Sequence, residues 1–141
     1  MQVETILQSK GRAVTTVAVH STIAQAVDLL NTHKIGAVVV TDGKKVVGIL
    51  SERDVVRHLG TDWTRLATRP VREVMTKNVV TTGRDATIDQ VMEQMTERRI
   101  RHLPVVEDGD LVGIISIGDV VKRKIEVTEQ EAIALKQYIA S

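Results

Sequence analysis

The spacing of apolar residues changes period several times along the chain, and each change marks an expected element. Residues 23–30 place apolar side chains three and four positions apart, which predicts a helix with its N-cap at Ser21 or Thr22. β-Branched runs at residues 37–40 and 46–50 predict two strands, and Asp42-Gly43 between them is a strong hairpin signal. A further helix is expected from Glu52 to about Leu59, which completes a helix–strand–strand–helix unit.

The segments around this unit follow other patterns. Residues up to about Arg12 have apolar side chains at helical spacing and a stop signal at Lys10-Gly11, and residues 13–19 predict a short extended strand. The stretch 60–68 is interpreted as a linker, and Pro70 is expected to begin a short helix ending near Met75. From Thr128 onward, a capping box with Glu131 and an apolar face predict a separate C-terminal helix.

The same order of elements returns 65 residues later. Residues 22–57 align with their counterparts without insertion or deletion, and 12 of the 36 positions are identical. Asp108-Gly109 supplies the second hairpin turn, displaced by one residue from the first. The chain is therefore interpreted as a tandem duplication. Each unit has too few strands to bury its own sheet, so the two sheets are expected to pack together about an approximate twofold axis, with two equivalent clefts.

These patterns predict an α/β (α+β) fold of two tandem β-α-β-β-α repeats, packed sheet to sheet, plus a C-terminal helix. The expected boundaries are residues 1–66 for the first repeat with its lead-in, 67–125 for the second repeat, and 126–141 for the C-terminal helix.

Each repeat contains the same corner, at which a strand turns into a helix. The corners are Gly-Ile-Leu-Ser-Glu-Arg-Asp at residues 48–54 and Gly-Ile-Ile-Ser-Ile-Gly-Asp at residues 113–119. The serine stands at the expected N-cap with the aspartate three residues later, which is close to a capping box. Capping alone accepts several residue types and does not require the same glycine, serine and aspartate twice. We therefore expect ligand binding at these corners too, since capping and binding can coexist.

Composition limits the classes of function. A chain of 141 residues with 43% hydrophobic content can bury a real core, and a net charge of +1 sets up no field that attracts nucleic acid or a membrane surface. The absence of cysteine excludes disulfides and thiolate chemistry. One Trp, one Tyr and no Phe provide no aromatic platform for stacking bases, so a bound base would lie between aliphatic side chains. The chain shows no secretory signal and no run of eighteen apolar residues, and a cytoplasmic protein is expected.

No motif indicates catalysis or metal binding. The four histidines lack metal-ligand spacing, and neither a phosphate loop nor a dinucleotide glycine motif nor an activated serine is present. We therefore expect no enzyme activity, no metal site and no catalytic cofactor.

The duplicated acids fit a binding role. A carboxylate accepts two hydrogen bonds at once, so Asp54 and Asp119 are candidate acceptors for a ribose diol, and Ser51 and Ser116 stand where helix N-terminal groups can receive a phosphate or ribose oxygen. Near the second hairpin, the basic residues are candidates for holding phosphate, although Arg98 and Arg99 are expected mainly to complement a helix dipole and to face water.

The two corners, the segment 71–76 (Val-Arg-Glu-Val-Met-Thr) and the segment 101–106 (Arg-His-Leu-Pro-Val-Val) together resemble a CBS-domain pair, the tandem cystathionine-β-synthase-type regulatory module. The resemblance covers nearly all of residues 3–124. It implies that an adenosine-containing ligand such as AMP, ADP, ATP, NAD or S-adenosylmethionine binds between the repeats, and that pairs associate into a homodimer.

The resemblance also implies the residues of each cleft. Cleft one would combine Arg101, His102, Ser116 and Asp119 with Ile6, Leu7 and Ile35. Cleft two would combine Gly36, Ala37, Ser51, Arg53 and Asp54 with Thr76, Val79 and Ile100. Because the second repeat has Arg101-His102 where the first has Gly36-Ala37, we expect cleft two to lack that basic pair and cleft one to bind the phosphorylated ligand more tightly. The expected function is a sensor that passes its occupancy to an unidentified protein; the alternative is a structural or oligomerisation module with vacant clefts.

Overall fold

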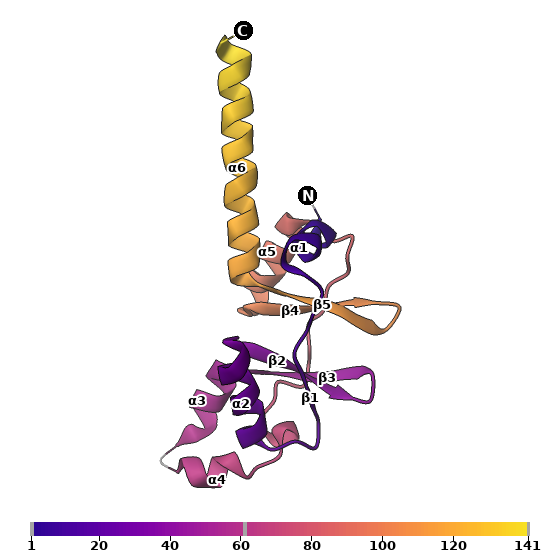
Figure 1. The fold of residues 1–141 in the computed structure, drawn as a ribbon, viewed down its shortest axis with the longest axis vertical. Coiled ribbons are helices and arrows are strands. Elements are labelled where there is room, and N and C mark those ends of the chain that lie inside the picture. The colour runs from indigo at the N-terminus through magenta and orange to yellow at the C-terminus, as the bar shows by residue number, and fades with distance from the viewer. Residues whose placement is uncertain (1, 61, 141) are drawn as a thin grey trace.

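The computed structural model describes residues 2–60 and 62–140, which form two similar halves and one projecting helix (Figure 1). The first half contains β1 (Thr16–Ala18), α2 (Ile23–His33), β2 (Ala37–Asp42), β3 (Lys45–Ser51), α3 (Glu52–Leu59) and α4 (Trp63–Ala67). The second half contains α5 (Ile88–Arg98), β4 (His102–Glu107), β5 (Asp110–Ser116) and the start of α6 (Ile117–Ala140). Two short elements precede the halves in the chain, α1 (Val3–Lys10) and a 3₁₀ helix, η1 (Val71–Glu73).

The sheets confirm the duplicated strand order, with one difference. In the first half, β1 pairs parallel with β2, and β2 pairs antiparallel with β3. In the second half, β4 and β5 form the same antiparallel hairpin, but the short leading strand is reduced to one parallel bridge between Thr82 and Val105. Strands β3 and β5 contact each other, and the two sheets face each other in Figure 1, as predicted for packing sheet to sheet.

The first hairpin loop lies one residue later than predicted, and the second is as predicted. Asp42 pairs with Lys45, so the first loop consists of Gly43 and Lys44, and Asp42 belongs to the strand. In the second hairpin the loop is Asp108-Gly109, and both residues have positive φ (52° and 83°), as a tight two-residue hairpin turn requires.

Both repeats begin their first helix with the same cap. The side chain of Thr22 accepts a hydrogen bond from the backbone of Gln25, whose side chain accepts one from the Thr22 backbone, and Thr87 and Gln90 repeat this arrangement. Each capping box satisfies amides that the first helical turn leaves without partners. This explains why the threonine and glutamine recur 65 residues apart, and it confirms Thr22 as the N-cap.

Each half has its own hydrophobic core, and the segments that lead into the halves are exchanged between them. Val3, Ile6 and Leu7 of α1 are buried in the core of the second half. Conversely, the core of the first half contains Val71 and Val74. The backbone repeats the exchange, because Val3 N donates to Ala86 O (2.9 Å) and Val71 N donates to Ser21 O (2.8 Å). The predicted boundaries 1–66 and 67–125 follow chain order, whereas the packing crosses them.

The predicted C-terminal helix is present, but its start was predicted wrongly, and so was the linker at residues 60–68. The stretch taken as a linker contains α4, whose Leu66 is buried in the first core. The C-terminal helix is not separate, because α6 runs without interruption from Ile117 to Ala140. The predicted cap residue Thr128 lies inside it, where its hydroxyl donates to Lys124 O at 2.9 Å. A helical threonine can bond the preceding turn in this way, so the Thr128–Glu131 pattern did not mark a start.

Candidate ligand-binding site

The first corner places a carboxylate at the junction of β3 and α3. The Asp54 Oδ2 atom accepts hydrogen bonds from the backbone N of Ser51 (2.9 Å) and from its hydroxyl (3.1 Å). In return, the Ser51 hydroxyl accepts from Asp54 N (3.2 Å), which completes the predicted capping box. These bonds fix the orientation of the carboxylate, and they leave Asp54 Oδ1 with Thr76 Oγ1 at 3.4 Å as a long contact. Capping therefore orients the acid without using all of its acceptor capacity.

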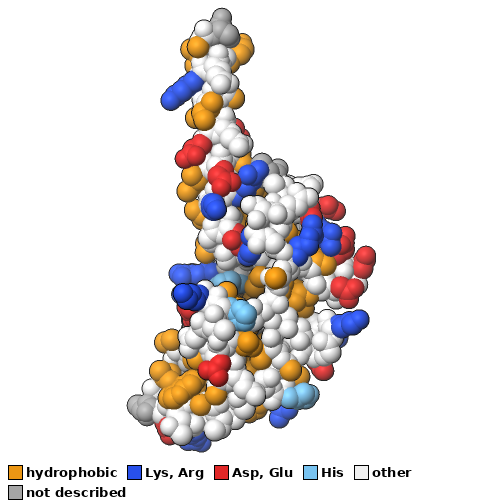
Figure 2. Space-filling model, in the orientation of Figure 1, with side chains coloured by type: hydrophobic (Ala, Val, Ile, Leu, Met, Phe, Trp, Pro, Cys, Tyr) orange, Lys and Arg blue, Asp and Glu red, His pale blue; other side chains and the backbone are white. Residues whose placement is uncertain are grey.

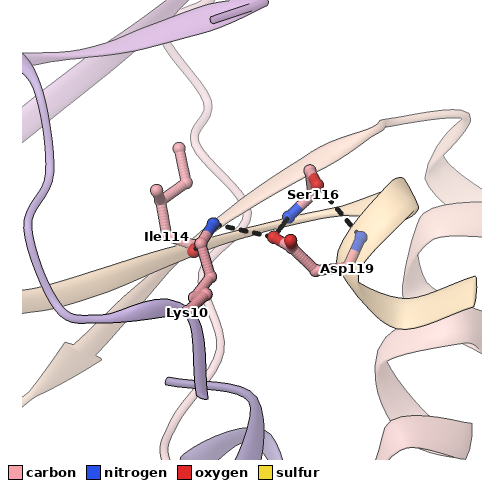
Figure 3. Close-up of polar contacts among 4 residues, drawn as sticks. All are labelled: Lys10, Ile114, Ser116 and Asp119. Carbon is pink, nitrogen blue, oxygen red and sulfur yellow. Dashed lines mark hydrogen bonds and ion pairs between the residues drawn. The ribbon is translucent and has the colours of Figure 1, made fainter. Parts of the chain in front are cut away.

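The second corner has the same cap but an additional cation (Figure 3). Asp119 Oδ2 accepts from Ser116 N (2.9 Å), and Ser116 Oγ accepts from Asp119 N (3.2 Å). Lys10, at the end of α1, donates to the same Asp119 oxygen at 2.7 Å and to Ile114 O at 3.0 Å. Burial raises the pKa of the Asp119 carboxyl, but hydrogen bonds from Lys10 and Ser116 outweigh burial and hold the pKa below its ordinary value. In cleft one, the Lys10 ammonium group therefore neutralises the Asp119 carboxylate, which was expected to bind a ligand's ribose.

A cavity of about 510 Å³ lies at cleft two. It lies between the Ser51–Asp54 corner of the first half and the residues that precede β4 in the second half. Its walls are formed by Gly36, Ile49, Ser51, Glu52, Arg53, Asp54, Arg57, Thr76, Arg98, Arg99, Ile100, Arg101 and His102. Figure 2 shows Lys and Arg side chains gathered at the narrow junction of the two halves, below the projecting helix.

Most residues predicted for cleft two meet at this cavity, namely Gly36, Ser51, Arg53, Asp54, Thr76 and Ile100. Ala37 is instead buried in β2, and Val79 is half-buried and does not line the cavity. Arg101 and His102, which were assigned to cleft one, line this cavity as well. The expectation that cleft two lacks the basic pair was therefore wrong. The pair precedes and begins β4, and His102 packs against Gly36 of the first half, so the pair lies beside the opposite repeat's corner.

Sequence reasoning missed three arginines of this site. Arg57 lies one helical turn after Arg53 on α3, and this four-residue spacing was a usable signal. Arg98 and Arg99 are exposed, as expected, but they also border the cavity. Arg99 adopts the left-handed conformation (φ 54°) that ends α5, as Lys34 (φ 52°) does at the end of α2. In both repeats, the first helix therefore ends at a basic C-cap residue in the left-handed conformation.

The apolar residues predicted for cleft one have structural roles. Ile6 and Leu7 are buried in the second core. Ile35 is half-buried and packs against the first core. A Cβ atom added to Gly113 would lie 2.6 Å from Leu7 Cδ2, so α1 packs directly on the glycine of the second corner.

His102 lies between the two corners. The Cβ that a side chain at Gly36 would carry falls 3.4 Å from His102 Nε2, so the ring packs against the first half. Burial lowers the pKa of His102 below its ordinary value, and Lys10 and Arg101 lower it further against the opposing effects of Glu52 and Asp119. The imidazole is therefore held neutral near pH 7, beside groups of both corners.

Other kinds of site receive no support from the described residues. Within residues 2–60 and 62–140, no group of three or more His, Cys, Asp or Glu side chains is arranged to hold a metal ion. Across the same ranges, no helix combines the length and the apolar character needed to cross a membrane.

The paired corners, exchanged lead-ins and inter-repeat cavity define a module of two tandem repeats with a candidate binding site between them. Comparison with known proteins specifies the class, because the CBS domain family matches residues 10–61 and 71–126. The chain therefore belongs to the CBS-domain family, as a pair of CBS domains.

Relatives with curated descriptions differ in length from this chain. It is 32% identical to the mitochondrial CBS domain-containing protein CBSX3 of Arabidopsis thaliana over 84% of this chain and 60% of that protein. It is 34% identical to an inosine-5'-monophosphate dehydrogenase of Methanocaldococcus jannaschii over 79% of this chain, which is 22% of that enzyme. The chain thus spans about three fifths of the plant relative and about a fifth of the dehydrogenase.

Two solved structures match over almost their whole length. The CBS-domain containing protein ATU1752 from Agrobacterium tumefaciens superposes with a TM-score of 0.84 and 48% identity, covering 88% of this chain and 99% of that one. The CBS domain pair of protein MJ0100, solved in complex with 5-methylthioadenosine and S-adenosyl-L-methionine, has a TM-score of 0.78 and 28% identity and covers 91% and 98%.

Proposed function

We propose that this CBS-domain pair is a regulatory sensor that binds an adenine nucleotide (AMP, ADP, ATP or NAD) at cleft two and passes its occupancy to a partner protein. One observation carries the proposal. The carboxylate of Asp54, held in orientation by Ser51, borders the same 510 Å³ cavity that five arginines line. An acceptor for sugar hydroxyls and several donors for phosphate are the two polar requirements of a nucleotide.

Each part of the nucleotide has a matching group. The ribose hydroxyls donate to Asp54, whose Oδ1 has only a long contact with Thr76 among the described residues. Phosphate oxygens accept from the arginines, whose planar guanidinium groups can bond them in pairs. The adenine ring lies against Ile49 and Ile100, the aliphatic side chains of the cavity wall. This assignment agrees with the lack of aromatic side chains for stacking.

The charge of the cavity favours phosphorylated ligands over S-adenosylmethionine. Five arginines face two carboxylates, Glu52 and Asp54, so the wall is basic near neutral pH. The basic wall does not attract the sulfonium cation of S-adenosylmethionine, whereas each nearby guanidinium group attracts a phosphate. The structure of the MJ0100 domain pair supports the adenosine part of the proposal, because that protein was solved with two adenosine-containing ligands.

Cleft two, rather than cleft one, is the proposed nucleotide site. The basic pair Arg101-His102 lines the cavity beside Asp54, and in cleft one the Asp119 carboxylate already has Lys10 as its partner. A ligand at cleft one would have to displace that ion pair. This reverses the order of affinity expected from the sequence.

Regulation, rather than catalysis, is the proposed role. The match to the dehydrogenase covers only 22% of that enzyme, and the Ser51 hydroxyl and Asp54 carboxylate of the cavity are bonded to each other in the helix cap. The regulated protein, a homodimeric state and a cytoplasmic location remain predictions.

Titration calorimetry of the full chain with AMP, ATP and NAD tests the proposal on two matched variants. Both Asp54→Ala and Asp119→Ala remove the acid of a capping box, but only Asp54 borders the cavity. We expect Asp54→Ala to weaken binding about ten- to hundredfold, since a charged hydrogen-bond acceptor contributes about 1.5–3 kcal/mol. Asp119→Ala should change affinity by less than about threefold.

Equal losses in both variants, or a loss only in Asp119→Ala, would contradict the assignment of cleft two. If none of the nucleotides binds the wild-type chain, the alternative of an oligomerisation module is favoured instead. Circular dichroism of each variant shows whether the fold survives the lost cap.

A further inference from the structure

Helix α6 extends far beyond the half from which it starts (Figure 1). Within α6 only Val120 is buried, and every residue from Thr128 to Ala140 is exposed. Helices draw most of their stability from packing an apolar face against another element, and no described element of the chain covers this stretch. Its apolar side chains therefore form a surface that a second molecule can cover.

The exposed side chains follow a heptad pattern. Positions alternate four and three residues apart along one line of the helix, in the order Val121, Ile125, Thr128, Ala132, Leu135 and Ile139. The four large members are 44%, 53%, 59% and 74% exposed, respectively. This line is called the α6 seam below. It spans about 27 Å at 1.5 Å per residue, and its period of 3.5 residues is that of a left-handed coiled coil.

The charges beside the seam specify a partner of the same sequence and direction. In a parallel pair of such helices, the residue just before Ile125 and the residue just before Ala132 each face the residue five places later on the partner helix. Glu131 then faces the second copy's Lys136, and Lys124 faces the second copy's Glu129. Both contacts join opposite charges, although Lys124 also reaches Asp89 in its own chain at 3.2 Å.

An antiparallel arrangement centred on the same seam is disfavoured. It would place Glu129 opposite the second copy's Glu129 and Glu131 opposite the second copy's Glu131. Like charges at these flanking positions repel, so the sequence discriminates between the two directions.

We propose that α6 pairs with α6 of a second copy of this chain as a parallel two-stranded coiled coil. The twofold axis would run along the projecting helix, so each half would meet the identical half of the other copy. The first half has a matching feature on α3 and α4, where Val56 (68%), Leu59 (37%) and Trp63 (43%) are exposed large hydrophobic side chains. Val56 is the counterpart of the seam residue Val121 in the duplicated sequence, and α3 lies on the same edge of the molecule as α6 (Figure 1).

Sedimentation equilibrium of two neighbouring variants tests the seam. Leu135 and Ile133 are almost equally exposed (59% and 56%), but only Leu135 lies on the seam. Leu135→Lys should raise the dimer dissociation constant at least about a hundredfold, because each copy loses an apolar contact, whereas Ile133→Lys should leave it nearly unchanged. A monomeric wild-type chain, or equal effects of the two substitutions, would overturn the proposal. Both side chains are exposed, so neither substitution is expected to disturb folding.

Disulfide cross-linking tests the direction separately. The natural chain contains no cysteine, so a single introduced thiol reports one position. In the parallel pair, the thiols of two Ile139→Cys chains are adjacent and should oxidise to a covalent dimer, whereas Ile133→Cys should not. Absence of the Ile139→Cys cross-link in a dimeric sample would overturn the parallel arrangement. Neither readout involves a nucleotide, so failure here leaves the proposed ligand site unaffected.

Discussion

At the scale of residues, the repeated glycine of the two corners is explained by close approach. Gly48 and Gly113 each lie under a side chain of an exchanged lead-in, Met75 over Gly48 and Leu7 over Gly113. A Cβ at Gly48 would also lie 3.1 Å from Thr76 O, a backbone atom. The glycine is therefore required by packing, whereas the serine and aspartate that follow it are required by the cap. Beyond the cap, Asp119 is paired with Lys10, whereas Asp54 has only a long contact with Thr76 among the described residues.

Replacing the second glycine should destabilise the fold. Gly113→Ala places a methyl group 2.6 Å from Leu7 Cδ2, and Leu7 is fully buried and cannot move without disturbing the second core. We expect the free energy of unfolding to fall by about 1–3 kcal/mol, the usual effect of overpacking. Urea denaturation measures it, with Gly83→Ala as control because a Cβ there meets no atom within 4 Å. Similar values for the two variants would show that the lead-in does not restrict this position.

At the scale of elements, α1 covers the second corner. Its apolar residues anchor it in the second core, and Lys10 in its last turn places an ammonium group on Asp119. The counterpart of α1 is the η1 segment, which packs on the first half but places no cation at Asp54 among the described contacts. The aspartates of the two corners thus have different partners, a lysine at Asp119 and a threonine hydroxyl at Asp54, because different elements cover the corners.

The Lys10–Asp119 pair should make stability depend on acid pH. Because the pKa of Asp119 is lowered in the folded chain, the ionised carboxylate stabilises the fold above its unfolded pKa of about 3.9, and this contribution is lost as the pH falls through the folded value. Lys10→Met should lower the free energy of unfolding at pH 7 by about 1 kcal/mol, since both side chains are partly exposed.

The difference between Lys10→Met and the wild type should shrink as the pH falls below about 4. Urea denaturation at pH 7 and pH 3 measures it. A difference independent of pH would show that Lys10 stabilises through its aliphatic stem, without the ion pair.

At the scale of the whole molecule, His102 connects the two clefts. It borders the cavity of cleft two, and its pKa responds to Lys10 and Asp119 of cleft one. A phosphate bound at cleft two, as proposed, would act on a ring whose pKa Lys10 and Asp119 of the other corner also influence. Such a shared group provides a physical route by which the occupancy of one cleft influences the other.

Nucleotide binding should strengthen as the pH falls from neutral into the acid range. Burial keeps the pKa of His102 below its ordinary value in the free protein, and a bound phosphate raises that pKa, so the complex takes up protons in this range. NAD is the suitable ligand because its phosphate groups do not titrate there. Calorimetry in buffers of different ionisation enthalpy measures the uptake, and His102→Gln should abolish it. Uptake that persists in this variant would assign the proton to another group.

The sequence by itself determined the duplicated unit, its capping boxes and the chemistry of the two corners. Those features depend on contacts within a few residues, such as Thr22 with Gln25 or Ser51 with Asp54, and spacing along the chain is enough to specify them. Only the tertiary structure decided which corner remains open. The sequence placed Arg101 only with the second corner, whereas folding also placed Arg101 on the cavity beside Asp54 and brought Lys10 to Asp119 across 109 positions of the chain. Pairings at that separation depend on how the two halves and their exchanged lead-ins pack, which no local pattern of residues specifies.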